Sequence, residues 1–443
     1  MKRVFTVLLC FLTAVGITAG RSVTTWAVEA GHFPSVATVS TDTTEDDTLR
    51  TALTIGSKQD PITDWNNLQN QVSAALASGF SDIAIYIKSM TIDTEFIIQK
   101  TDVSLTFMSA DDQTAVLMLD KDVSKDINTN FIGAFWFRGG YSYEDGEFKV
   151  DGSKNISLNF DNVLIDGNGG GCAIYDEFGT LALKNAMIRN CAPNIYGAVV
   201  AYEGNLTMSG CVFTNNTGGA VMADRLIATN CFFSKNSYSI GGGAVVVGNA
   251  EVDTGGDTVL TNCTFTANHA DGDGGAIKYI GNQYGNTLQI SGCVFDGNTA
   301  CDNGGAIFAL GCDSLAVKLY ISGTRFMNNT AGKDGGAIWI GTFSNEMFPP
   351  TTTADATGLT AAQDVVFSGN KAGQTVILRD GTQFTSPYDN NDVVFTPVSI
   401  ELTNARKENP ATGDTSDMDW VFVFAPVLAC VAGLIFLRKL GTR

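Results

Sequence analysis

The sequence predicts an all-β fold, a right-handed parallel β-helix (β-solenoid), and three observations support this prediction. A short motif recurs along the middle of the chain, alternating apolar segments accompany it, and the 443 residues include 48 glycines but only 9 prolines. Many glycines with few prolines indicate repeated tight turns rather than a disordered, proline-rich chain. With 44% hydrophobic and 16% charged residues, the chain can bury a large core.

The recurring motif is Phe-x-x-Asn, followed in five of six copies by Gly-Gly-Ala-Val or Gly-Gly-Ala-Ile. The six copies are Phe213/Asn216, Phe233/Asn236, Phe265/Asn268, Phe295/Asn298, Phe326/Asn329 and Phe367/Asn370. Successive phenylalanines are 20, 32, 30, 31 and 41 residues apart. A solenoid of helices would keep a tighter period, so constant motifs at variable spacing favour a β-solenoid whose loops differ in length. The six Phe/Asn pairs are expected to form a structural ladder inside the coils.

The segments around the motif alternate as strands do. Leu288–Phe295 alternates apolar and polar residues, breaks at Ser291-Gly292 and resumes, and two other coils repeat this pattern. Each coil should therefore have two short strands that meet at a bend, an Asn turn, and a Gly-Gly turn into a third strand. Degenerate copies at Ile165–Asn168 and Ile188–Cys191 extend the array. We expect about ten to twelve coils, and thus a stack about 50 Å long.

The predicted β-helix domain covers residues 61–402. An open-ended solenoid needs its ends covered, and residues 64–77 place Trp65, Leu68 and Val72 at helical spacing. These residues predict an N-terminal capping helix. Residues 31–60 are expected to be a flexible segment, because 34–52 is rich in Thr, Ser and Asp.

Coils that carry both Gly-Gly-Ala-Ile and Phe-x-x-Asn resemble the repeats of polymorphic outer-membrane proteins, a family of surface β-helix adhesins. The resemblance covers about residues 160–370. It implies the β-helix fold and a role in adhesion or surface interaction, and it carries over no partner.

The first thirty residues have the pattern of a signal peptide. Lys2 and Arg3 precede an apolar stretch, and a small-residue cleavage site fits after Ala30, with a cut near Ala19 as an alternative. Cys10 would suggest a lipoprotein, but Leu9 is too bulky for the usual lipobox. The chain is therefore expected to be secreted.

The C-terminal segment has three parts in a fixed order. Asn409, Pro410, Ala411, Thr412 and Gly413 lie in the linker 403–419, and residues 420–443 contain an apolar run to Leu437 and a basic tail. Pentapeptide, apolar run and basic tail together resemble a Gram-positive, LPXTG-like sortase sorting signal. The run is long enough for a transmembrane helix, and the basic tail should stay in the cytoplasm. The resemblance implies that a sortase cleaves after Thr412 and joins it covalently to peptidoglycan, so the protein would be anchored in the cell wall at the cell surface. Asn409 replaces the usual leucine, which leaves the sortase class open, and the alternative is a plain membrane anchor.

The formal net charge of −19 argues against a nucleic-acid partner, because such a surface repels phosphate backbones. The expected partners are therefore a sortase, peptidoglycan, the membrane before sorting, and a glycan or surface-protein ligand.

Four cysteines, Cys211, Cys231, Cys263 and Cys293, lie two residues before a repeat Phe, and Thr324 and Val365 take that position in later coils. A site that accepts Cys, Thr and Val indicates a small buried side chain, so a ladder of thiols is favoured over disulfides. Cys301 and Cys312 flank a strand that should keep them too far apart to pair.

Residues for catalysis are few, so we expect no catalytic site, no metal site and no cofactor. His269 lies beside the Asn268 turn, and the other histidine is His32. Asp273, Asn303 and Asp334 each precede the Gly-Gly of consecutive coils, where Asp and Asn are good turn formers. A weak calcium site or a catalytic pair of acids remains open there. Two functions are therefore compared: a non-catalytic surface module, and a wall-bound carbohydrate-active enzyme (a polysaccharide lyase or glycoside hydrolase) on the same scaffold.

Overall fold

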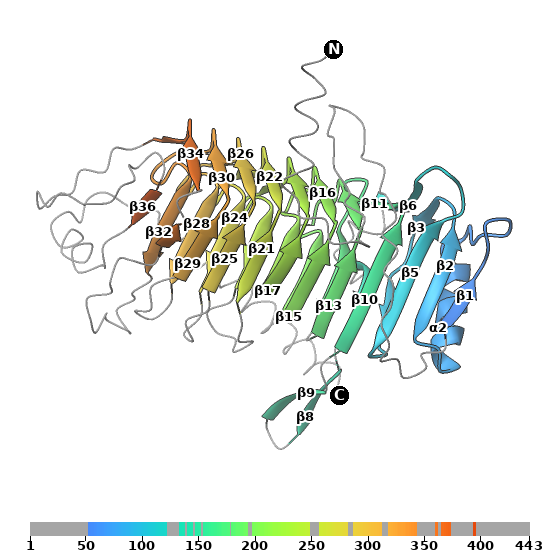
Figure 1. Cartoon of the computed structure of the whole chain (residues 1–443). Helices are drawn as coiled ribbons and strands as arrows, with labels where there is room; N and C mark the ends of the chain where they lie inside the picture. The colour runs from blue at the N-terminus through green and yellow to red at the C-terminus, as the bar shows by residue number, and fades with distance from the viewer. Residues whose placement is uncertain are drawn as a thin grey trace, which may run out of the picture. The chain divides into compact units, whose positions relative to one another are not determined.

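A computed structural model of the chain describes residues 52–121, 133–137, 140–144, 147–151, 154–177, 179–193, 197–248, 257–281, 287–311, 318–342, 359–361, 365–373 and 393–395. Within these ranges the parallel strands of successive coils lie side by side, from β1 and β2 (blue) to β34 and β36 (orange to red) in Figure 1. The described residues therefore form a parallel β-helix, as the repeats predicted.

The strands of each coil belong to three parallel sheets, and a two-stranded antiparallel hairpin is separate from them. The largest sheet has nineteen strands: β1 (Ala52–Ile55), β2 (Asp82–Ile87), β4 (Phe96–Ile98), β5 (Val103–Ser109), β7 (Gly133–Phe137), β10 (Lys154–Asp161), β12 (Cys172–Glu177), β13 (Gly179–Lys184), β15 (Val199–Ser209), β17 (Val221–Thr229), β20 (Val245–Val247), β21 (Thr258–Thr261), β24 (Ile277–Ile280), β25 (Thr287–Ser291), β28 (Ile307–Gly311), β29 (Lys318–Ser322), β32 (Ile338–Thr342), β33 (Leu359–Ala361) and β36 (Val393–Phe395). The second sheet has ten: β3 (Met90–Ile92), β6 (Ala115–Leu119), β11 (Val163–Asp166), β14 (Met187–Arg189), β16 (Val212–Thr214), β18 (Phe232–Ser234), β22 (Thr264–Thr266), β26 (Val294–Asp296), β30 (Arg325–Met327) and β34 (Val366–Ser368). The third has five: β19 (Ser237–Tyr238), β23 (His269–Ala270), β27 (Thr299–Ala300), β31 (Thr330–Ala331) and β35 (Lys371–Ala372). The hairpin consists of β8 (Gly140–Glu144) and β9 (Glu147–Asp151).

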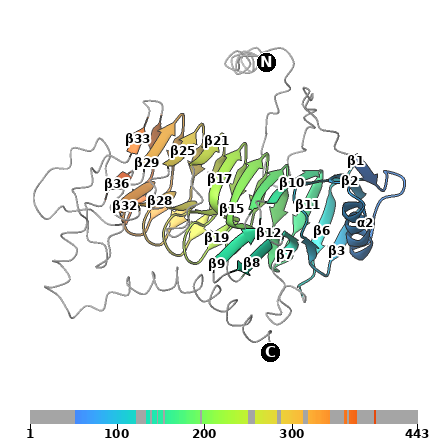
Figure 2. The same ribbon diagram turned by 90° about the horizontal axis from the view of Figure 1, so that it is seen from below.

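A regular coil has four straight sides, which we name by their sequence. The Gly-Gly strand (for example β24) follows the two glycines, the long strand (β25) comes next, the Phe strand (β26) carries the repeat Phe, and the short strand (β27) follows the repeat Asn. The short strand is a side that the sequence did not predict. Only two residues long, it gives too little alternation to be recognised in the sequence. Figure 2 shows the same strands from below, among them the long strands β21, β25, β29 and β33 and the Gly-Gly strands β28, β32 and β36.

The β-helix begins earlier in the chain than predicted. β1 lies within residues 31–60, which were expected to be flexible, and it pairs in parallel with β2 through Leu53↔Ile83 and Ile55↔Ile85. Ile55 is buried and Leu53 packs against the core, so two apolar residues are enough to add this strand. The preceding polar stretch masked the strand in the sequence.

The helix α2 spans Trp65–Ala77, as the apolar spacing predicted. The Asp64 carboxylate caps it by accepting a hydrogen bond from the Asn67 backbone N–H at 2.7 Å. Its buried face includes Leu68 and Val72, and the Trp65 ring contacts Phe96 and Phe135 edge-on. These two phenylalanines are inward-facing residues of β4 and β7, so the helix packs against the inside of the first coils.

The repeat phenylalanines form one continuous stack in the core. Ring centroids of neighbouring coils lie 4.7–5.2 Å apart and the rings are nearly parallel, from Phe213 through Phe367. The strand pairing places Phe directly beside Phe in each coil, and Ile165 and Ile188 continue the column in the degenerate coils. This spacing is the distance between adjacent strands of a sheet.

The repeat asparagines form a second stack, in which nearly every polar group has a partner. In Asn298, Nδ2 donates to Asn329 Oδ1 at 2.9 Å and to the Phe265 carbonyl at 3.0 Å. Its Oδ1 accepts from both Nδ2 and the backbone N–H of Asn268. The same pattern joins Asn216, Asn236, Asn268, Asn298, Asn329 and Asn370. A buried polar ladder of this kind is stable because its groups are satisfied.

Two positions in the coils that carry the motif adopt the left-handed conformation, which explains why Asn and Gly are frequent there. At the bend between the long strand and the Phe strand, Asn185, Gly210, Asn230, Asn262, Gly292 and Gly323 have φ between 52° and 64°. The residue before the repeat Asn adopts the same conformation and is Asn or Gly in four coils, whereas Lys235 and Ala267 take this position in two others. Asn and Gly are the residues that tolerate this region best.

We predict that Asn298→Ala destabilises the fold although it removes few atoms. The change leaves the buried Asn268 backbone N–H and the Phe265 carbonyl with fewer partners, and each unsatisfied group costs about 1–3 kcal/mol. Chemical denaturation should show the loss. The exposed Asn66 on α2 provides the control, because Asn66→Ala should leave the midpoint unchanged. Equal midpoints for the two variants would contradict the ladder's contribution to stability.

Candidate functional site

The acids predicted to stack before the Gly-Gly turns are brought together, and hydrogen bonds hold them in the turns. The backbone N–H and Nδ2 of Asn303 both donate to Asp273 Oδ1, at 3.1 and 3.0 Å. The backbone N–H of Asp334 in turn donates to Asn303 Oδ1 at 3.3 Å. Asn303 therefore lies between the two carboxylates, and its backbone and side-chain N–H groups donate hydrogen bonds to one of them, that of Asp273.

Lys278, which the sequence analysis missed, lies beside Asp273. Its side chain is 7% exposed, and Nζ lies 3.9 Å from Asp273 Oδ2 and donates to the Ile240 carbonyl at 3.4 Å. Nζ also lies 5.6 Å from the centre of the Phe308 ring, which stacks on Trp339 with centroids 4.4 Å apart. Lys278, Phe308 and Trp339 occupy one column on the outer side of three adjacent Gly-Gly strands. A buried ammonium is thus compensated by a carboxylate, a carbonyl and an aromatic face.

The charge of Asp273 depends on this environment. Burial raises the pKa of the Asp273 carboxyl above its ordinary value of 3.8, while the Lys278 ammonium and the Asn303 donors partly oppose that rise. A partly buried carboxyl next to a lysine is the kind of group that enzymes use as an acid. However, general acid–base hydrolysis of a glycoside needs a second carboxyl across an open space, and here Asn303 occupies the space between the coils.

The Gly-Gly turns leave no room for side chains, which fixes the backbone around these acids. Gly274, Gly304 and Gly335 have φ of 66–72°, and an added Cβ would lie 2.2–2.4 Å from the carbonyl oxygen of the Ile three residues later. The turn folds back over the strand that it begins. The acids therefore stand on a rigid, tightly closed corner of the coil.

Four successive coils have their extra residues at one corner, between the Gly-Gly strand and the long strand. From β18 onward the Asn turn has two residues in every coil, and the turn into the Gly-Gly strand has six before β20, β24, β28 and β32, whereas twenty residues separate β35 from β36. At the corner between the Gly-Gly strand and the long strand, β17 forms both strands without interruption, because it pairs with both β20 and β21. Later coils insert residues between these two strands. These insertions are residues 248–257, 281–286, 312–317 and 343–358, and the β8–β9 hairpin interrupts an earlier coil between β7 and β10. We call this corner the insertion edge.

The predicted thiol position is occupied as a buried column. Cys211, Cys231, Cys263 and Cys293 are buried, the Cys263 N–H contacts Cys293 Sγ, and the Cys293 N–H donates to Thr324 Oγ1 at 3.2 Å. The seven described cysteines are free, and Cys312 lies outside the described residues. Burial raises the pKa of the Cys172 thiol to about 12 and raises that of Cys191 well above its ordinary value. These two thiols are therefore poor nucleophiles. The column of Cys211, Cys231, Cys263 and Cys293 is part of the buried core, where its contribution is packing.

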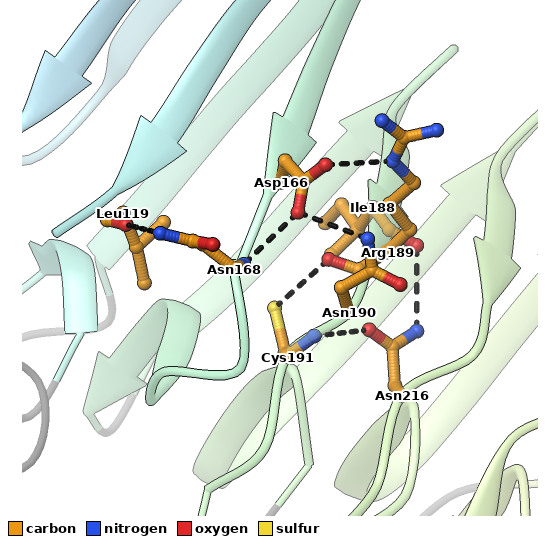
Figure 3. A network of polar contacts seen from close by, with 8 residues as sticks. All are labelled: Leu119, Asp166, Asn168, Ile188, Arg189, Asn190, Cys191 and Asn216. Atoms are coloured by element: carbon orange, nitrogen blue, oxygen red, sulfur yellow. Dashed lines mark hydrogen bonds and ion pairs between the residues drawn. The ribbon is translucent and has the colours of Figure 1, made fainter. Parts of the chain in front are cut away.

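A polar network around Asp166, also missed from the sequence, lies where the asparagine ladder begins (Figure 3). The Asp166 carboxylate accepts hydrogen bonds from Arg189 Nε at 2.8 Å, Asn190 Nδ2 at 3.0 Å and the Asn168 backbone N–H at 2.9 Å. Cys191 takes the ladder position here, and its backbone N–H donates to Asn216 Oδ1. The network joins adjacent coils where the Phe-x-x-Asn motif is degenerate.

The electrostatics of Asp166 mark it as a structural acid. Burial favours the neutral carboxyl and would raise its pKa, but the hydrogen bonds from Asn168, Asn190 and Arg189 and the Arg189 charge together hold the pKa below 3.8. The carboxylate is thus ionised in the fold and fully engaged with Arg189 and the asparagines.

The predicted sorting residues, Asn409, Pro410, Ala411, Thr412 and Gly413, lie outside the described residues, as do the signal peptide and residues 420–443. Among the helices that the structure describes, none has the length and apolar character needed to cross a membrane.

We predict that Asp166→Asn destabilises the protein by about 1–3 kcal/mol near neutral pH, because the ionic hydrogen bonds are lost. A carboxyl whose pKa is lowered on folding stabilises the fold above its unfolded pKa and loses that contribution as the pH falls through its folded pKa. The difference between variant and wild type should therefore shrink below about pH 4. Urea unfolding across this pH range measures it, with the exposed Asp112→Asn as control. A difference independent of pH would contradict the assignment.

Two family models match this chain. One, described as right handed beta helix region, matches residues 148–331, and the other, the Chlamydia polymorphic membrane protein repeat, matches residues 323–341. No curated protein matches the chain. The two matches agree with the stacked parallel strands and the Phe-x-x-Asn repeats described above. The chain thus contains a right-handed parallel β-helix with repeats of the polymorphic membrane protein type.

Proposed function

We propose that this chain is a cell-surface protein, anchored in the cell wall, whose β-helix binds ligands without cleaving them. The single observation that carries the binding role is the insertion edge: the coils that carry the Phe-x-x-Asn motif keep the same inner stacks, and four of them in succession differ in what they insert at one corner. A rigid scaffold with variable connections on one edge is a common way to build a binding surface. The match to a polymorphic membrane protein repeat supports a surface adhesin-like protein.

The inner surface of the coils offers few side chains for ligand binding. Phenylalanine and asparagine stacks and the thiol column fill it, and these side chains are buried. Ligand contacts would come from the outer faces, among them Tyr320, which is 43% exposed on a long strand, and from the insertions. The ligand class that best suits such an edge is a glycan or another surface protein.

A non-catalytic role is supported by the way the acids are used. Asp273 accepts two hydrogen bonds from Asn303, which lies between it and Asp334. The alternative, a wall-bound carbohydrate-active enzyme, is favoured by one observation: burial raises the pKa of Asp273, and Lys278 lies beside it.

The N-terminal helix has a place in this proposal. We propose that α2 closes the first end of the stack, supported by the Trp65 contacts with inward-facing Phe96 and Phe135. A covered end leaves no open strand edge there for aggregation at the cell surface.

We expect the full-length protein to retain glycans on an array of plant, mucin and cell-wall polysaccharides and to release no reducing ends from them. Residues 248–257 can be replaced with a short glycine-containing connector, because β17 shows that a coil closes without an insertion. This variant should bind less glycan, because it lacks one of the insertions that would contact the ligand. Asp273→Asn and Asp334→Asn are the catalytic controls and should leave binding intact. Turnover by the wild type that both substitutions eliminate would establish the enzyme instead.

Anchoring is tested separately at Thr412. Thr412→Ala removes the residue whose carbonyl a sortase would attack, so the variant should move from the wall fraction to the membrane fraction or the medium. Wall purified by boiling in detergent retains covalently bound protein, and a Ser416→Ala variant outside the pentapeptide should behave as wild type. Equal retention of Thr412→Ala and wild type would leave the tail as a plain membrane anchor.

A further inference from the structure

Three side chains with metal-ligating atoms meet on the outer side of the short strands. They are His269 on β23, Asp271 just after it, and Cys301 just after β27. One ligand atom from each lies within 4.8 Å of the other two, and the side chains are partly or fully exposed. Asp271 and Cys301 were not considered together in the sequence, and His269 was interpreted as a turn residue.

The β-helix register explains why they meet. Ala270 pairs with Ala300, and the Cys301 backbone N–H donates to the Ala270 carbonyl at 2.9 Å, so Asp271 and Cys301 occupy equivalent positions in adjacent coils. Ala270 and Ala300 are buried, and alternate residues of a strand point to opposite sides. His269 and Asp271 therefore point outward together, and Cys301 stands next to Asp271.

The imidazole is already oriented for a ligand. His269 Nδ1 lies 2.8 Å from Thr299 Oγ1, and Nε2 lies 3.1 Å from Asp271 Oδ1. If the ring carries its proton on Nδ1 and donates it to the threonine, the Nε2 lone pair faces Asp271 and Cys301. An outer hydrogen bond of this kind is what fixes the tautomer and orientation of metal-bound histidines.

Space and charge also favour a cation at this place. In the next coil, Gly332 occupies the position equivalent to Cys301, so no side chain covers the thiol from that direction. The neighbouring Lys333 is 2.9 Å from Asp302 and is thus paired with another carboxylate. The net charge of the whole chain is −19.

We propose that His269, Asp271 and Cys301 bind a divalent transition-metal ion of the zinc type. Imidazole, thiolate and carboxylate form a mixed donor set that suits Zn²⁺, whereas Ca²⁺ and Mg²⁺ prefer oxygen ligands alone. Zinc–ligand bonds of about 2.0–2.3 Å place tetrahedral ligand atoms about 3.3–3.7 Å apart. His269 Nε2 and Asp271 Oδ1, 3.1 Å apart, are already near this spacing, and the exposed Cys301 side chain needs to move by at most about 1 Å. Cys301 would release its proton to solvent on binding. Three protein ligands leave a fourth position for water or for a group from a partner.

The first test is metal binding by the purified full-length protein. Zn²⁺ titrated calorimetrically should bind with one-to-one stoichiometry, and Co²⁺ in its place should give the near-ultraviolet absorption of a thiolate–cobalt bond. Cys301→Ser should abolish that absorption, and His269→Ala should weaken Zn²⁺ binding more than Thr299→Val. Loss of the outer hydrogen bond in Thr299→Val should itself cost about 10–100-fold in affinity.

The control is the double variant Asp302→Asn/Lys333→Gln, which removes the ion pair beside Cys301 without touching the three ligands and leaves the local net charge unchanged, and it should bind Zn²⁺ as wild type does. A thiolate absorption that persists in Cys301→Ser, or equal Zn²⁺ affinity in His269→Ala and wild type, would overturn the proposal. Binding weakened as much by the Asp302→Asn/Lys333→Gln control as by His269→Ala would show that Zn²⁺ binding does not depend on the three ligands and would also overturn it.

A second measurement needs no variant. Zn²⁺ should slow the alkylation of Cys301 in the wild-type protein, read by peptide mass spectrometry, while the buried cysteines stay unmodified with or without metal. Alkylation of Cys301 at the same rate in the presence of saturating Zn²⁺ would exclude the thiol as a ligand.

Discussion

The register between coils is the constraint on which the rest of this structure depends, and the asparagine ladder is the interaction that fixes it most directly. Each ladder amide binds the backbone and side chain of its neighbour, so a coil displaced by one residue would leave several buried polar groups unpaired. The Asn turn therefore has constant length from β18 onward, and the turn into the Gly-Gly strand has six residues in each of these coils except the last, whereas the insertion edge lies outside both. The coil can accept extra residues only where the ladder does not pass, and this explains the variable spacing of the repeat phenylalanines.

The inner side of the coils could be predicted from the sequence because the inward-facing positions repeat from coil to coil. Phe-x-x-Asn, Gly-Gly-Ala-Ile and the cysteine position recur with the same neighbours, and the structure stacks them coil on coil. Features that occur once were harder to predict. β1 is only four residues long and follows a polar stretch, and the short strands have two residues each. Asp166 and Lys278 gain their partners from adjacent coils, so no local pattern marks them.

The cluster of His269, Asp271 and Cys301 shows which contacts on the outer surface can be predicted from the sequence. Phe265 and Phe295 are 30 residues apart, and the same offset relates Asp271 to Cys301. Once the register of these two coils is known, their proximity follows. The sequence analysis compared Cys301 with Cys312 along the chain instead of with its neighbour across the coils, and it treated His269 alone. In a solenoid, chemistry is assembled across coils, so candidate ligands must be compared at the coil offset rather than at short spacings.

The two outer surfaces are separate parts of the same coil. The cluster of His269, Asp271 and Cys301 belongs to the short-strand side, and the insertion edge begins only after the six-residue turn and the Gly-Gly strand. At about 3.3 Å per residue, a Gly-Gly strand of four residues alone puts roughly 10 Å or more between them. Sites this far apart with no shared side chain should respond independently to substitution. The rigid register that joins the coils thus lets one face change its insertions while another keeps a fixed set of ligands.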